Sequence, residues 1–110
     1  VPYAVFTSPP IGGFGLAEWE AKNKKLSYDV LKSDFKSIGK SKLIRDTRGF
    51  VKVIYDKKTR QILGVHIIGP DADNLIHEFA AVATAKGTID VIQKTIHIHP
   101  TLAEVNTNLF

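Results

Sequence analysis

The chain contains no cysteine among its 110 residues. This absence excludes a disulfide framework and any thiolate metal site within the chain. Methionine is absent too, and the sequence begins Val1-Pro2, so we expect a fragment of a longer polypeptide. No apolar run approaches the ~20 residues that span a bilayer, and no basic region followed by an apolar one marks a secretory signal. We therefore expect a cytoplasmic protein with no membrane partner.

The bulk composition is that of an ordinary globular protein, with 44% hydrophobic and 24% charged residues. A chain of this length is expected to form a single domain, 1–110, that can bury roughly 65% of the surface of its unfolded state. The net charge of +4 raises the question of a nucleic-acid partner. The lysines between positions 22 and 42 are spread along the chain rather than clustered with aromatic residues, so we interpret them as solvated surface and expect no nucleic acid to bind.

The first two thirds of the chain carry strand patterns. Val51, Val53 and Tyr55 alternate with Lys52, Ile54 and Asp56 in a period-two pattern. A polar turn at 56–60 separates this segment from the mostly apolar run 61–68. This pattern predicts an antiparallel hairpin at the centre of a sheet, and the near-continuous apolar character of 61–68 suggests a strand covered on both faces. Two further strands are expected over 3–8 and 26–35.

Three glycines near the N-terminus, Gly12, Gly13 and Gly15, are expected to form a loop. They do not match a dinucleotide-binding fingerprint, because Glu18 stands where that fingerprint needs glycine or alanine. A short helix over 17–24 is expected to follow, since acidic residues in its first turn favour the helix dipole.

Helical patterns follow the strands. Residues 72–86 place apolar side chains on one broad face and small ones on the other, so we expect this helix to be buried on more than one side. Lys86 and Gly87 close it, and shorter helices are expected over 89–94 and from 101. Strands first and helices afterwards predict an α+β fold, in which helices pack on one face of an antiparallel sheet.

The most informative segment runs from Ile96 to Glu104, where a histidine precedes a proline and a carboxylate follows the histidine by five positions. Pro100 biases His99 toward extended geometry, and a helix is expected to begin near Pro100 or Thr101, so that Glu104 can fold back toward the imidazole. A carboxylate on one ring nitrogen fixes the tautomer and leaves the other nitrogen free as a base. Thr101 and Glu104 also fit a Thr-x-x-Glu capping box, in which Glu104 is a structural cap.

The other three histidines are given no catalytic role. His97 precedes His99 by two residues and would share its face in an extended segment, but only Glu104 stands nearby as a further ligand, so we predict no metal site. His66 lies within an apolar strand and is interpreted as a hydrogen-bonded structural residue. His77 is expected on the polar side of its helix.

The segment His99–Glu104 resembles the His-Pro-Thr-x-x-Glu signature of the FAD-dependent pyridine nucleotide–disulfide oxidoreductases, which include dihydrolipoamide dehydrogenases and glutathione reductases. Residues 5–12 and 15–21 resemble the opening of that family's C-terminal domain, and residues 49–53 and 62–70 resemble its central hairpin. These motifs occur in the expected order. The resemblance implies the family's dimerisation, or interface, domain, and it is specific for the domain but not for a substrate.

In this family two such domains pack together, and each delivers its His-Pro segment to the flavin and disulfide of the other subunit. Carried onto this chain, the resemblance implies that His99 is the acid/base that exchanges protons with a thiol, and that Glu104 orients His99 and stabilises its protonated form. Pro100 is often cis in this family, and the backbone of His99 and Pro100 would lie near the partner subunit's flavin. FAD and NAD(P)H would be bound mainly by upstream domains. Because the chain has no cysteine, we expect the isolated domain to be inactive.

The sequence departs from some branches of the family. Mercuric reductases usually have an aromatic residue where His99 stands and a cysteine pair near the C-terminus, and this chain has neither. Residues 105–108 do not follow the tail of better-characterised members, so lipoamide, glutathione and other small disulfides stay open as substrates, as do NADH and NADPH. Two alternatives are kept: a domain of a soluble transhydrogenase-like flavoenzyme, and a non-catalytic association module whose His99–Glu104 contact only fastens the last helix.

Overall fold

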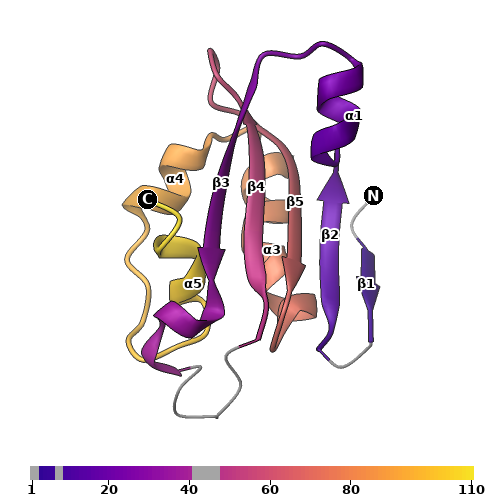
Figure 1. Cartoon of the computed structure of the whole chain (residues 1–110). Coiled ribbons are helices and arrows are strands. Elements are labelled where there is room, and N and C mark those ends of the chain that lie inside the picture. Colours follow the sequence, from indigo (N-terminus) through magenta and orange to yellow (C-terminus); the bar gives the residue numbers. More distant parts are fainter. Residues whose placement is uncertain (1–2, 7–8, 41–47) are drawn as a thin grey trace.

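The computed structural model describes residues 3–6, 9–40 and 48–110, which form a five-stranded antiparallel sheet with helices on its faces (Figure 1). The strands are β1 (Tyr3–Val5), β2 (Ile11–Gly15), β3 (Tyr28–Asp34), β4 (Phe50–Asp56) and β5 (Ile62–Ile68). The helices are α1 (Glu18–Asn23), the short 3₁₀ helix η1 (Phe35–Ser37), α3 (Ala72–Thr84), α4 (Ile89–Lys94) and α5 (Glu104–Thr107). The α+β class expected from the sequence is confirmed.

The hairpin of β4 and β5 lies at the centre of the sheet, as the sequence predicted. The strand order is β1-β2-β5-β4-β3, and Val53 pairs with Val65 while Lys52 pairs with His66. Because side chains alternate along a strand, the two valines point to one face of the sheet and Lys52 and His66 to the other. Both valines are fully buried, so the first face carries the hydrophobic core.

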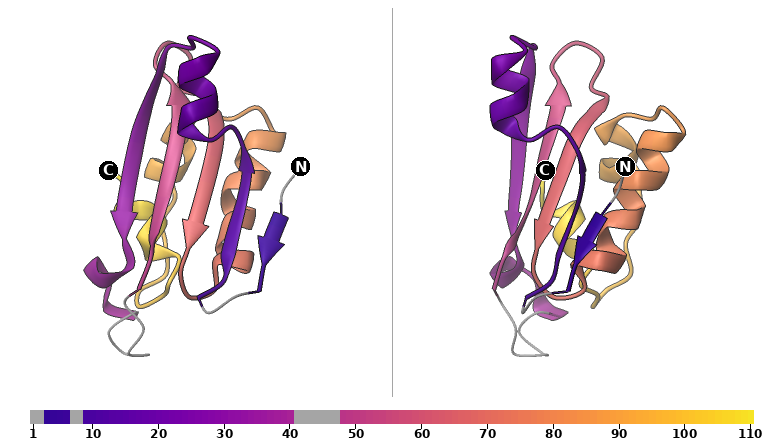
Figure 2. Two further views of the ribbon diagram at one scale, coloured as in Figure 1. Left: turned by 45° about the vertical axis from the view of Figure 1, so that its right-hand side comes forward. Right: turned by 90° about the vertical axis from the view of Figure 1, so that its right-hand side faces the viewer.

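Helices α3, α4 and α5 cover this core face of the sheet (Figure 2). Helix α3 contributes strongly to the core because its apolar residues recur at helical spacing. The buried cluster comprises Phe35, Ile38, Val51, Val53, Tyr55, Val65, Ile67, Ala72, Leu75, Ile76, Phe79, Ile89, Ile92, Val105 and Leu109. The last two of these belong to the C-terminal segment, so the core holds α5 against the sheet.

Helix α1 lies on the opposite face of the sheet, as the right-hand view of Figure 2 shows. Ala21 of α1 and Ile54 of β4 are fully buried there. Elsewhere this face stays open in the single chain, and His66 and Ile68 of β5 are only half-buried. The sequence predicted that β5 is covered on both faces, but its second face is only partly covered. The helices that follow the hairpin all pack on the core face.

The glycines expected to form a loop lie in strand β2 instead. β2 pairs with β1 on one side and with β5 on the other, and Gly13 is opposite both Tyr3 and His66. The close approach of α3 explains the need for glycine, since a Cβ on Gly12 would lie 2.7 Å from the carbonyl oxygen of Ala72. Gly12 therefore reflects the packing of a helix against a strand.

The remaining elements lie close to their predicted ranges, except that the last helix begins at Glu104 rather than at 101. Residues 7–8 of the predicted first strand lie outside the described residues. Within the described ranges, no helix is both long and apolar enough to cross a membrane. The compartment in which the protein works remains a prediction.

Candidate active site

The candidate site lies on the turn that joins α4 to α5. Helix α4 ends at Lys94, and residues 96–103 form an irregular turn rather than the expected strand-like segment. The His99–Pro100 peptide bond is cis, a feature that the resemblance implied. The Thr101 hydroxyl donates a hydrogen bond to the carbonyl of Ile98 at 2.6 Å and so spans the two residues between them.

Glu104 folds back onto this turn and contacts His99. The Nδ1 atom of His99 lies 2.9 Å from Oε1 and 3.0 Å from Oε2 of Glu104, and the same Oε1 accepts the backbone N–H of Thr101 at 2.9 Å. The pair and the cap, which the sequence left as alternatives, therefore coexist on one carboxylate. Only half of the capping box is present, because the Thr101 hydroxyl bonds to Ile98 instead of to the helix.

Both hydrogen bonds stabilise Glu104 as a carboxylate. The Thr101 N–H in the first place, and the His99 imidazole in the second, lower the pKa of the Glu104 carboxyl below its ordinary value of 4.5. A carboxylate next to Nδ1 favours the tautomer that carries its proton there, which makes Nε2 the basic nitrogen. Among the described residues, none forms a hydrogen bond with Nε2, and the His99 side chain is 75% exposed.

This arrangement can take up and release a proton at Nε2. The chain offers no thiol for it to act on, since cysteine is absent. Apolar side chains flank the histidine at the surface, where Ile96 is 96% and Ile98 is 76% exposed. The imidazole of His99 is therefore exposed on an apolar turn, and this chain supplies no thiol that could exchange a proton with it.

His97 does not share the exposed position of His99. Its side chain is only 7% exposed, and its Nε2 lies 2.7 Å from Oε2 of Glu78 on α3. The other oxygen of Glu78 accepts a hydrogen bond from Nδ2 of the fully buried Asn106 at 2.6 Å. The expectation that both histidines share one face is thus wrong, because the segment is not a strand. Sequence reasoning also missed Glu78 and Asn106, although a carboxylate beside the core residue Phe79, in a helix of mostly small and apolar residues, was a usable signal.

The two remaining histidines lie elsewhere in the fold. His66 contacts the carbonyl oxygen of Leu16 through Nε2 at 3.0 Å, so it is hydrogen-bonded as expected. His77 is exposed on α3, as expected. In the part of the chain that the structure describes, no group of three or more histidine and acidic side chains could hold a metal ion.

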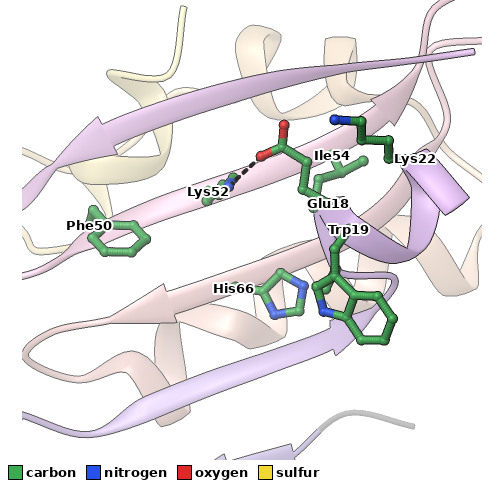
Figure 3. Close-up of a pocket in the computed structure, with 8 residues that line it drawn as sticks. Glu18, Trp19, Lys22, Phe50, Lys52, Ile54 and His66 are labelled. Atoms are coloured by element: carbon green, nitrogen blue, oxygen red, sulfur yellow. Dashed lines mark ion pairs between the residues drawn. The ribbon is translucent and has the colours of Figure 1, made fainter.

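A cavity of about 540 Å³ lies on the open face of the sheet beside α1 (Figure 3). Glu18 reaches across it to Lys52, with 2.6 Å between Oε1 and Nζ, and this hydrogen bond and charge lower the pKa of Glu18. The lining residues are Ala17, Glu18, Trp19, Lys22, Phe50, Lys52, Ile54 and His66. None of them belongs to the turn 96–103, so we assign this cavity no part in the chemistry of His99.

Comparison with known proteins finds relatives for nearly the whole chain. The family model for the dimerisation domain of the pyridine nucleotide-disulphide oxidoreductases matches residues 1–109. The dihydrolipoyl dehydrogenase of Chlamydia trachomatis is 40% identical over 105 residues, which are 96% of this chain and 23% of that protein. Dihydrolipoyl dehydrogenase 3 of Haloarcula marismortui is 39% identical over 104 residues, 94% of this chain and 22% of that protein.

The fold also has counterparts among solved structures. The Cu(II) complex of the HOCl-induced flavoprotein disulfide reductase RclA from Escherichia coli matches 99% of this chain and 25% of its own, with a TM-score of 0.95 and 29% identity. The chain therefore spans about a quarter of the length of the relatives it matches.

Proposed function

The chain belongs to the dimerisation-domain family of the pyridine nucleotide-disulphide oxidoreductases, and we propose that its parent protein is a homodimeric, FAD-dependent NAD(P)H:disulfide oxidoreductase. In this proposal the domain supplies His99 and Glu104 as an acid/base pair to the flavin and disulfide site of the partner subunit. The supporting observation is the geometry of the pair: Glu104 holds Nδ1 of His99 at 2.9 Å, and the imidazole is otherwise exposed.

In the proposed reaction His99 moves one proton. With Nδ1 engaged by Glu104, Nε2 can accept the proton of a substrate dithiol, and the resulting thiolate can attack one sulfur of the redox disulfide and release the other as a thiolate. In the reverse direction the imidazolium returns the proton to the leaving thiolate. The negative charge of Glu104 stabilises the protonated ring. Bound FAD would supply electron transfer between the reduced disulfide and NAD(P)⁺.

The exposed surface around His99 supports a site that two subunits share. His99 and Pro100 are both exposed, so their side chains and backbone are accessible to a flavin held by another subunit. The exposed Ile96 and Ile98 are typical of a surface that a partner covers. Because relatives with 40% and 39% identity are dihydrolipoyl dehydrogenases, dihydrolipoamide is the substrate to test first.

A non-catalytic association module is the second candidate. It is favoured by the hydrogen bond from the Thr101 N–H to Glu104, which gives the carboxylate a structural task that needs no chemistry. The two candidates make opposite predictions for a variant that keeps the fold and removes the base.

The discriminating experiment is His99→Gln in the full-length parent protein. We expect disulfide turnover to fall by a factor of about 10² to 10⁴, because general acid/base catalysis is lost, while flavin content and dimer size stay unchanged. His77→Gln, at an exposed position of α3, is the matched control and should retain full turnover. Unchanged turnover in His99→Gln would leave the association module. Hydride transfer between nicotinamide nucleotides without any disulfide reduction would instead favour the transhydrogenase-like flavoenzyme.

A further inference from the structure

One carboxylate on α3 is tied to both sides of the His99–Pro100 turn. Oε2 of Glu78 lies 2.7 Å from Nε2 of His97, two residues before His99. Oε1 of the same side chain accepts a hydrogen bond from Nδ2 of Asn106 at 2.6 Å, two residues after Glu104. His97 and Asn106, which flank the acid/base pair in the sequence, therefore both contact the side chain of Glu78.

Glu78 lies on a helix that is packed into the core, whereas the turn lies at the surface. Its neighbour Phe79 is fully buried in the core under α3, so the helix cannot shift at this level without disrupting the packing. On the turn, Ile96 and Ile98 lie at the surface, and His97 between them points inward to Glu78. On the N-terminal side of the turn, the exposed isoleucines therefore make little packing contact with the core. On the C-terminal side, the buried Val105 packs into the core as well.

We propose that Glu78 is a positioning residue, which holds His99 against Glu104 by anchoring His97 on one side of the turn and Asn106 on the other. Glu78 touches neither member of the pair and acts through the backbone between its two anchors. An effect of Glu78 on catalysis rests on the proposed function of His99. The positioning of the His99 ring does not, and it can be measured in the 110-residue chain alone.

The test on the 110-residue chain follows the tautomer of His99. At about pH 8.5, where imidazoles are neutral, the ring ¹⁵N chemical shifts report whether the proton stays on Nδ1 beside Glu104. Glu104→Ala gives the reference shifts for a lost contact. We expect Glu78→Ala to move the His99 shifts at least halfway to that reference, and Glu78→Gln to restore most of the wild-type shifts, because its amide can bond to both anchors. Asp73→Asn, on the same helix, is the control and should leave them in place.

Glu78→Ala also deprives the buried Asn106 of its acceptor, so His97→Phe is measured beside it. Phenylalanine keeps a buried ring and replaces both ring nitrogens, including the Nε2 atom that contacts Glu78, while the contact of Glu78 with Asn106 stays available. We expect the same displacement of the His99 shifts in this variant. If the His99 shifts keep their wild-type values in every folded member of the set Glu78→Ala and His97→Phe, the inference is overturned.

Kinetics in the full-length protein separate this inference from the proposed function. We expect Glu78→Ala to lower kcat about 10- to 100-fold with little change in KM. In a His99→Gln background the same substitution should not lower kcat further, because Glu78 acts through His99. An equal loss in both backgrounds would show a merely structural role and overturn the inference. If His99→Gln itself keeps full turnover, the proposed function fails, and the ¹⁵N shifts alone decide whether Glu78 positions the ring.

Discussion

Glu104 holds the Nδ1 atom of His99 at 2.9 Å with the same oxygen that accepts the backbone N–H of Thr101. One carboxylate thus orients the imidazole and fastens the start of α5. The two tasks differ in what they need: the backbone contact needs an acceptor oxygen, whereas stabilising a protonated ring needs a negative charge. Substitutions at Glu104 can therefore separate them.

Glu104→Gln should lower disulfide turnover of the full-length protein without unfolding the domain. The glutamine oxygen can still accept the Thr101 N–H, but the charge that stabilises the imidazolium is gone. We expect a loss smaller than that of His99→Gln, roughly 10-fold, and a changed pH profile of kcat/KM. Glu104→Ala removes both contacts and should lower the midpoint of thermal unfolding as well. Equal thermal stability of the two variants would contradict the structural task assigned to Oε1.

The lowered pKa of Glu104 makes the stability of the fold depend on pH. Because its folded pKa lies below 4.5, the carboxylate contributes stability that is fully present above this value and is lost as the pH falls through the folded pKa. Urea unfolding of Glu104→Gln should therefore show a deficit relative to its parent that is constant near neutral pH and shrinks as the pH falls below about 4.5. Both proteins are compared in a His99→Gln background, so that protonation of His99 does not contribute. A deficit that stays constant to about pH 3 would refute this assignment.

Gly12→Ala should destabilise the fold by about 1–3 kcal/mol, because the added methyl group has no room. Its Cβ would lie 2.7 Å from the carbonyl oxygen of Ala72, a backbone atom that can move only with α3. Gly39→Ala is the matched control, since among the described residues beyond its chain neighbours the nearest heavy atom to its Cβ is Cε1 of His99 at 3.9 Å. Both substitutions restrict the unfolded chain similarly, so the difference in urea unfolding free energy isolates the clash. Equal stabilities would show that α3 does not press on β2.

The sequence predicted those parts of the fold in which apolar and polar side chains follow the period of the secondary structure. Val51 and Val53 alternate with Lys52, so the period-two pattern predicted the hairpin. Strand β2 stayed hidden because glycines have no side chain to show alternation. The reason for Gly12 lies in Ala72, which is far along the chain and comes close only in the folded state.

In the candidate site too, contacts between residues close in sequence were predicted and contacts between distant residues were not. His99 and Glu104 are five residues apart, so local chain geometry allowed their contact, and the resemblance to the family favoured it over a cap alone. The contacts of Glu78 with His97 and Asn106 join residues separated by 19 and 28 positions. They depend on how α3 packs against the C-terminal segment, which no local pattern encodes.

Replacing Ile96 and Ile98 together with serine should weaken the proposed dimer of the full-length protein. Both side chains are largely exposed in the single chain, and covering a large aliphatic side chain contributes about 1.5–3 kcal/mol. We expect the dissociation constant measured by sedimentation equilibrium to rise at least about tenfold, with thermal unfolding of the 110-residue chain unchanged. Leu26→Ser, at an exposed leucine between α1 and β3, is the control. An unchanged dissociation constant in the double variant would show that no partner subunit covers this turn.

A shared active site can be tested by mixing two inactive proteins. One full-length variant carries His99→Gln, and the other keeps His99 but has both redox cysteines of the proposed disulfide replaced. If each subunit supplies its histidine to the other, a heterodimer contains one complete site and one site that lacks both components. Random exchange makes half of the dimers heterodimers, so the mixture should regain about a quarter of the wild-type turnover. If His99 works within its own subunit, every site in the mixture lacks one component and turnover stays at the level of the separate variants. A wild-type mixture taken through the same exchange shows that the procedure preserves activity, and restored turnover would then place His99 at the partner subunit's disulfide.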